Sequence, residues 1–108
     1  MKYSSKIKKS KKLYDLIKSL KDGDKIELEF TFYPYGGREK KVLKPTLRAH
    51  LNYKDEIDYS LWDVIKGMNI NKVTKTSLRG YTFDMMSQRT SYMFPLTNFK
   101  VIEVIRKK

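Results

Sequence analysis

The clearest pattern in the chain is a strict alternation of apolar and polar side chains over residues 26–33. The apolar positions are Ile26, Leu28, Phe30 and Phe32, and the polar positions between them are Glu27, Glu29, Thr31 and Tyr33. Because successive side chains of a strand point to opposite faces, this period of two predicts a strand that is buried on one face.

Gly36-Gly37 follows this strand and is a strong signal for a tight hairpin turn. A two-residue turn there places Phe30 opposite Leu43 and Ile26 opposite Leu47, so both strands agree on the inward face. The same register sets Glu29 across from Lys44. Pro45 cannot donate a ladder hydrogen bond, so the second strand is expected to be an edge or to contain a bulge. The outward positions of that strand are Lys44, Thr46, Arg48 and His50.

The N-terminal part of the chain changes character at Ser10. Residues 1–12 contain six lysines and no acidic residue, and such like-charge density favours a flexible arm. From Ser10, a plausible N-cap, apolar residues recur at helical spacing until Asp22-Gly23, a usual helix stop. We therefore expect a flexible basic arm over residues 1–9 and a single domain over residues 10–108 that begins with a helix.

The remaining chain predicts mostly short strands. Ser60 is a candidate cap for a short internal helix that ends at Gly67, although the same run also fits a strand. Four further strands are expected over residues 72–76, 78–85, 90–94 and 99–106, with a loose hairpin at residues 85–89. Pro95 lies in a corner, expected to be one turn of 3₁₀ helix, before the last strand.

A helix, about five short strands and a one-turn corner before the last strand are similar to small SH3-like or Sm-like barrels. The resemblance covers residues 24–106 and rests on a common fold pattern without a family motif. It implies a mainly β fold with an N-terminal helix. An OB-like barrel, or an α+β sheet with helices on one face, has the same strand count and patterning and is the alternative.

Composition narrows the classes of site. The absence of cysteine excludes disulfides and thiolate metal sites, and a single histidine cannot build a histidine-based zinc site. No apolar run approaches the roughly 20 residues that span a bilayer, and the basic N-terminus lacks the apolar core of a signal peptide. We therefore expect a cytoplasmic protein with no membrane contact and no cofactor.

The net charge of +12 is the largest anomaly of the sequence. A strongly basic surface attracts polyanions, of which nucleic acid is the commonest. Basic residues interleaved with aromatic ones fit this partner, because cations contact phosphates and rings stack on bases. The candidate nucleic-acid-binding residues are Lys6, Lys8, Lys9, Lys11, Lys12, Tyr33, Tyr35, Arg38, Lys40, Lys41, Lys44, Arg48, Arg79, Tyr81 and Arg89.

Candidates for catalysis are few. His50 beside Arg48 is an arrangement that RNA cleavage could use, and carboxylates are the ligands that Mg²⁺ prefers. The candidate carboxylates are those of the acidic segment after His50, namely Asp55, Glu56, Asp58 and Asp63. A lone exposed histidine is usually a polar surface residue. Acidic residues in turns and at helix starts usually accept hydrogen bonds from backbone amides or face solvent. The sequence therefore predicts no enzyme and no metal site.

The expected function is a small nucleic-acid-binding protein that contacts phosphates of DNA or RNA with little base specificity. The alternative is a phage- or plasmid-type protein-binding module or inhibitor, which docks on an acidic or nucleic-acid-binding surface of a host protein. Trp62, the tip near Tyr35 and the edge near Pro45 would be its anchors, since aromatic residues dominate interface energetics. An exposed strand edge near Pro45 is compatible with a monomer and with a homodimer.

Overall fold

The computed structural model describes residues 5–33, 38–63 and 67–107, and it describes side chains from residue 11 onward within those ranges. One helix, α1 (Ser5–Lys18), precedes the strands. The strands are β1 (Lys25–Phe32), β2 (Lys41–Leu43), β3 (Thr46–Leu51), β4 (Ile57–Trp62), β5 (Met68–Val73), β6 (Ser77–Phe83), β7 (Arg89–Pro95) and β8 (Phe99–Ile105). A 3₁₀ helix, η2 (Leu96–Asn98), links the last two.

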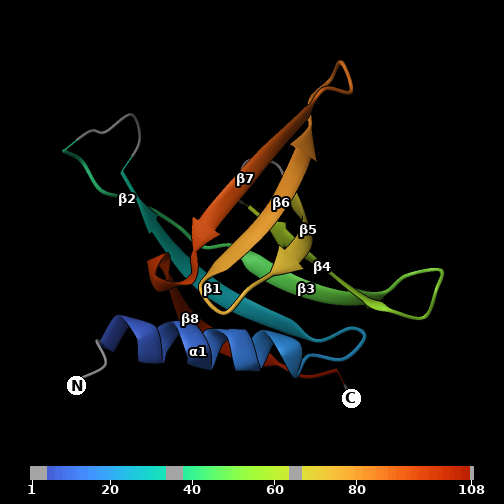
Figure 1. Ribbon diagram of the computed structural model, residues 1–108, viewed down its shortest axis with the longest axis horizontal. Helices are drawn as coiled ribbons and strands as arrows, with labels where there is room; N and C mark the ends of the chain where they lie inside the picture. Colours follow the sequence, from blue (N-terminus) through green and yellow to red (C-terminus); the bar gives the residue numbers. More distant parts are fainter. Residues whose placement is uncertain (1–4, 34–37, 64–66, 108) are drawn as a thin grey trace.

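The strands form one antiparallel sheet in the order β2-β1-β3-β4-β5-β6-β7, and β8 pairs with β1. Figure 1 shows that this sheet curls into a half-barrel, with α1 lying along its lower side. The mainly β prediction is therefore confirmed. The five-strand SH3-like barrel is not confirmed, because the sheet has eight strands.

The register of the first hairpin is confirmed. Phe30 pairs with Leu43, and Ile26 pairs with Leu47, as the alternation of apolar side chains predicts. Pro45 separates β2 from β3, and its carbonyl accepts a hydrogen bond from the Leu28 amide at 2.9 Å. The break in the second strand thus lies at the residue that lacks an amide hydrogen. The glycine turn itself lies outside the described residues.

Two helix predictions need correction. The helix begins at Ser5 rather than Ser10, so its backbone includes residues 5–9 of the expected arm. The predicted internal helix from Ser60 is wrong, because residues 57–62 form β4. This strand is paired with β3 through six residue pairs and with β5 through three. Ladder hydrogen bonds on both edges outweigh the local helical spacing of its apolar residues. The predicted 3₁₀ corner is confirmed at η2.

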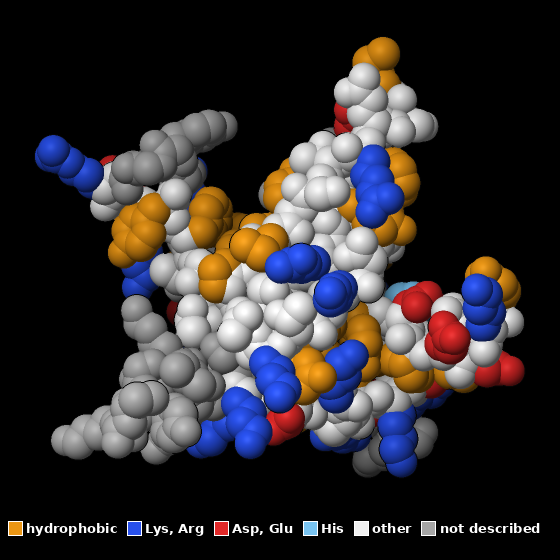
Figure 2. All heavy atoms as spheres, in the orientation of Figure 1, with side chains coloured by type: hydrophobic (Ala, Val, Ile, Leu, Met, Phe, Trp, Pro, Cys, Tyr) orange, Lys and Arg blue, Asp and Glu red, His pale blue; other side chains and the backbone are white. Residues whose placement is uncertain are grey.

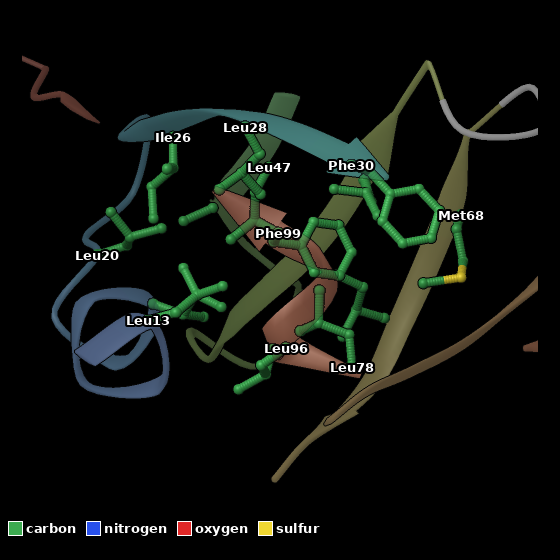
Figure 3. Packing of buried hydrophobic residues seen from close by; sticks show 14 residues of the cluster. Leu13, Leu20, Ile26, Leu28, Phe30, Leu47, Met68, Leu78, Leu96 and Phe99 are labelled. Atoms are coloured by element: carbon green, nitrogen blue, oxygen red, sulfur yellow. The ribbon is translucent and has the colours of Figure 1, made fainter. Parts of the chain in front are cut away.

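The core lies on the concave side of the sheet. Leu13 and Ile17 of α1, and Leu20 just after it, are buried against apolar side chains of the strands. Figure 3 shows Leu13 and Leu20 facing Ile26 and Leu96 across this core. The ring of Phe30 stacks on that of Phe99 at 4.7 Å between centroids. The core thus fixes the curvature of the sheet and leaves its outer face to polar and aromatic residues.

A buried carboxylate ties the end of α1 to the C-terminal segment. The side chain of Asp24 is 4% exposed and accepts hydrogen bonds from the Lys21 and Lys107 amides, each at 2.9 Å. Arg106 Nη1 lies 3.2 Å from the same carboxylate. The Lys21 amide, the Lys107 amide and the Arg106 guanidinium hold the pKa of Asp24 below its ordinary value of 3.8.

This lowered pKa predicts a pH dependence of stability. A carboxyl whose folded pKa lies below its unfolded value stabilises the fold above the unfolded value, and this contribution is lost as the pH falls through the folded pKa. We expect the gap in melting temperature between the wild type and Asp24→Asn to narrow as the pH falls below about 4. Thermal unfolding followed by circular dichroism over this range measures the gap. A gap that stays constant in acid would contradict the assignment.

Candidate nucleic-acid interface

The predicted binding residues fall into three groups in the structure. The first group lies on α1, where Lys11 and Lys12 are exposed. The backbones of Lys6, Lys8 and Lys9 belong to the same helix, but their side chains lie outside the described part of the chain. This group therefore lies on a helix whose Leu13 and Ile17 pack in the core.

The second group lies on the extension formed by the end of β1 and the start of β2. Tyr33 is 60% exposed there. Tyr35 lies outside the described residues. The exposed cations of this group are Arg38, Lys40 and Lys41. Tyr33 shares a groove of about 910 Å³ with Lys12 of α1 and Lys100 of β8. Figure 1 shows β2 and the end of β1 extending away from the β6–β7 hairpin.

Lys44 lies between β2 and β3 and is exposed. The register that sets Glu29 across from Lys44 is kept, because Phe30 pairs with Leu43 and Ile26 pairs with Leu47 on either side of it. On the other edge of β1, Glu29 lies opposite Lys100 of β8. Among the described side chains the one ion pair joins Asp24 to Arg106. The basic residues of the outer sheet face are therefore not neutralised by ion pairs within that part of the chain.

The third group lies in one row across the outer face of the sheet. Cross-strand pairing joins Arg48 on β3 to Ser60 on β4, Ser60 to Asn69 on β5, and Asn69 to Tyr81 on β6. Paired residues of neighbouring strands share one face of a sheet, and the strands lie about 4.8 Å apart. Arg48 and Tyr81 are thus about 14 Å apart along the row by this spacing. Here the fold brings together residues from distant parts of the sequence.

One end of this row carries the only tryptophan in the sequence. The guanidinium of Arg48 lies over the Trp62 ring, 5.5 Å from its centroid. The indole Nε1 donates a hydrogen bond to Ser60 Oγ at 3.0 Å. Gly67 has a φ of +96°, and a β-carbon at this position would lie 3.1 Å from the ring. The ring is therefore held in one orientation while remaining 45% exposed.

The other end carries a second cation–aromatic pair. Arg89, at the start of β7, lies over the Tyr81 ring at 4.2 Å, and Phe83 meets the same ring edge-on at 5.2 Å. Arg79 is exposed on the same face of β6, two residues from Tyr81. A guanidinium group is planar, and a base can stack on its plane as it can on an aromatic ring. We call Arg48, Trp62, Asn69, Tyr81 and Arg89 the cation–aromatic face.

Sequence reasoning missed two members of this face. Trp62 was assigned to a helix and considered only as an anchor for a protein partner, and Asn69 preceded the predicted start of its strand. The alternation of Tyr59 and Leu61 inward with Ser60 and Trp62 outward is the signal that could have placed the tryptophan.

Asp55, Glu56 and Asp58 lie together at the turn between β3 and β4 and at the start of β4. Figure 2 shows red side chains clustered at the turn between β3 and β4, apart from the blue side chains over α1. Within the described ranges, no three carboxylate or histidine side chains come together as metal ligands would. His50 on β3 faces Asp58 on β4 across the pairing. No helix in the described residues is long and apolar enough to cross a membrane.

Comparison of the chain with protein-family models, with curated proteins and with solved structures finds no match.

Proposed function

We propose that the protein binds single-stranded nucleic acid on the cation–aromatic face, with little dependence on base identity at the stacking positions and without catalysis. The observation that carries this proposal is the pair of cation–aromatic contacts, Arg48 over Trp62 and Arg89 over Tyr81, on one sheet face. Stacking on rings and guanidinium planes requires bases that are not already paired. A broad sheet face therefore suits a single strand better than a duplex groove.

The remaining basic residues act at longer range. The net charge of +12 raises the local concentration of a polyanion and speeds its encounter with the protein. The exposed lysines of α1 and of the β1–β2 extension supply this attraction, and the cation–aromatic face supplies the contacts that orient the strand. Such a division predicts affinity that depends strongly on salt and weakly on sequence.

The same arrangement supports a relationship to small SH3-like or Sm-like barrels, as a proposal about the fold. The helix before a curled antiparallel sheet and the 3₁₀ turn before the last strand are the features that favour it. The extra strands and the unpaired outer edge of β7 in the described sheet depart from a five-strand closed barrel.

Fluorescence anisotropy tests the proposed function directly. Labelled single- and double-stranded DNA and RNA are titrated with protein at about 50 and 200 mM salt. We expect single strands to bind more tightly than duplexes, and their affinity to fall about a hundredfold or more between the two salt concentrations. No binding of any probe at the lower salt concentration would overturn the proposal.

A protein partner is the second candidate function, and one specific observation favours it. Met85 and Met86, at the turn between β6 and β7, are 97% and 81% exposed, and Phe83 beside them is also exposed. Flexible methionine side chains adapt to apolar partner surfaces. Figure 1 shows this turn at the tip of a projecting hairpin. If no nucleic acid binds, this tip is where a partner would make apolar contacts.

A further inference from the structure

The sheet opens into a polar cleft next to the cation–aromatic face. Strands β4 and β5 are paired only at Tyr59–Ile70, Ser60–Asn69 and Leu61–Met68, although β4 begins at Ile57 and β5 continues to Val73. The pairing of β5 with β6 is also irregular between Ile70 and Lys72. A bulge bends a strand and re-aims its side chains. The two strands separate here and leave a cleft of about 570 Å³.

The floor of the cleft is partly apolar and its rim is polar. Ile57, Tyr59 and Ile70 contribute the apolar part. Burial, and to a smaller extent the nearby Tyr14, raises the pKa of Tyr59, so its hydroxyl stays protonated. The rim is lined by His50, Glu56, Asp58, Asn71 and Lys72. Asn69 and Tyr81 line the cleft as well. These last two belong to the cation–aromatic face, so the cleft and the face are continuous.

The charges around the cleft balance. Lys18 and Lys72 face it from α1 and β5, and Glu56 and Asp58 face it from the β3–β4 side. A phosphate would meet two carboxylates there, so the cleft suits a neutral group with a hydrogen-bonding edge. A flat ring over an apolar floor with polar atoms at its edge describes a nucleobase. A cleft of this volume lies in the usual range for small-molecule sites.

The carboxylates select among the bases. Asp58 Oδ1 accepts a hydrogen bond from Asn52 Nδ2 at 3.3 Å, which orients the carboxylate on its strand. An ionised carboxylate only accepts hydrogen bonds, and it accepts two side by side. Guanine presents two adjacent donors, N1–H and the N2 amine, on its Watson–Crick edge. Uracil has no amine, and adenine and cytosine place an acceptor beside their single amine, which a carboxylate repels.

We propose that this cleft binds a guanine base of the single strand lying on the cation–aromatic face. The Asp58 carboxylate accepts from guanine N1–H and N2–H, and the ammonium group of Lys72 donates to guanine O6. The inference rests on the proposed function and adds one position of base preference to a surface that is otherwise indifferent to sequence. It uses contacts to a Watson–Crick edge, which only an unpaired base offers.

The experiment compares two labelled RNA probes of about 12 nucleotides, a length within the known range of site sizes. One is oligouridine, and the other carries a single central guanosine. We expect the guanosine to raise the affinity about tenfold in the wild type, as a bidentate contact does. Asp58→Asn should remove this preference and change the affinity for oligouridine by less than about threefold. Inosine, which lacks the N2 amine, should give a value between the two.

Asp55→Asn is the matched control. Asp55 lies in the same acidic turn but does not line the cleft, and its φ of 60° is one that asparagine tolerates. It removes the same charge as Asp58→Asn and should retain the guanosine preference. Equal affinity of the wild type for both probes overturns the cleft assignment and leaves the proposed function in place. Retention of the preference in Asp58→Asn also overturns it. No binding of either probe overturns both.

Discussion

Replacing Gly80 by alanine is expected to destabilise the protein by about 3 kcal/mol or more. A β-carbon at this position would lie 2.2 Å from the backbone carbonyl oxygen of Asn69 and 3.0 Å from Met68 Cγ. Because the closest atom belongs to the backbone, no side-chain rotation relieves the clash. Strands β5 and β6 would have to separate, which would expose Met68 and Leu78 of the core.

Thr82→Ala is the control for this substitution. Thr82 lies two residues further along the same strand and is partly exposed, so its truncation should cost less than about 1 kcal/mol. Urea unfolding followed by circular dichroism gives the free energy of unfolding of both variants. A Gly80→Ala variant within about 1 kcal/mol of the wild type would contradict the close approach of the two strands.

The same close approach connects the fold to the site. Gly80 precedes Tyr81, and Tyr81 is paired with Asn69, whose carbonyl oxygen lies closest to Gly80. The glycine therefore sets the distance between two residues of the cation–aromatic face. If Gly80→Ala folds at all, its strands at this position are displaced relative to each other. The affinity for a single strand should then fall together with the stability, whereas Thr82→Ala should change neither.

The parts of the fold that could be predicted from sequence are those that local pattern determines. The alternation around Ile26 and Phe30 fixed both the strand and its partner register, since a slip of one residue would turn every apolar side chain outward. Pro45 marked the break in the second strand, and Pro95 marked the corner at η2. At the two prolines, a single residue restricts the backbone regardless of the rest of the chain.

The failures come from interactions between distant residues. Leu61, Trp62 and Met68 fit a helical period as well as a strand, and only pairing with β3 and β5 decides between them. The same error hid Trp62 from the candidate site. Arg48, Asn69 and Tyr81 come together only when four strands are laid side by side, which no single-segment pattern shows.

Some residues of the outer face are candidates from sequence alone. Arg79, Tyr81 and Arg89 are all candidates from sequence, and Arg89 lies over the Tyr81 ring in the structure. The sequence pattern places Arg48 on the outward side of the same strand as Lys44. The structure places it over Trp62, because the outer side chains of β3 and β4 face one another. Whether these residues contact nucleic acid stays a prediction.

Replacing Trp62 by alanine is expected to lower the affinity for single-stranded nucleic acid about tenfold to a hundredfold, because stacking of one base on an aromatic ring contributes about 1–3 kcal/mol. Trp62→Phe should recover part of the loss, since it keeps a ring but not the hydrogen bond to Ser60. The chain contains no other tryptophan, so quenching of intrinsic fluorescence on binding reports contact at this ring.

Tyr53→Ala is the matched control for this prediction, and its outcome separates stacking from charge. Tyr53 is 89% exposed and has the ammonium of Lys54 over its ring at 5.4 Å, so it is also a cation–aromatic pair, but it lies in the acidic turn between β3 and β4. If bases stacked on any exposed aromatic ring of this protein, Tyr53→Ala would weaken binding as much as Trp62→Ala. We expect it to leave the affinity unchanged, because the neighbouring carboxylates repel phosphates. An equal loss in the two variants, or no quenching of Trp62 on binding, would mean that the outer sheet face is not where the strand lies.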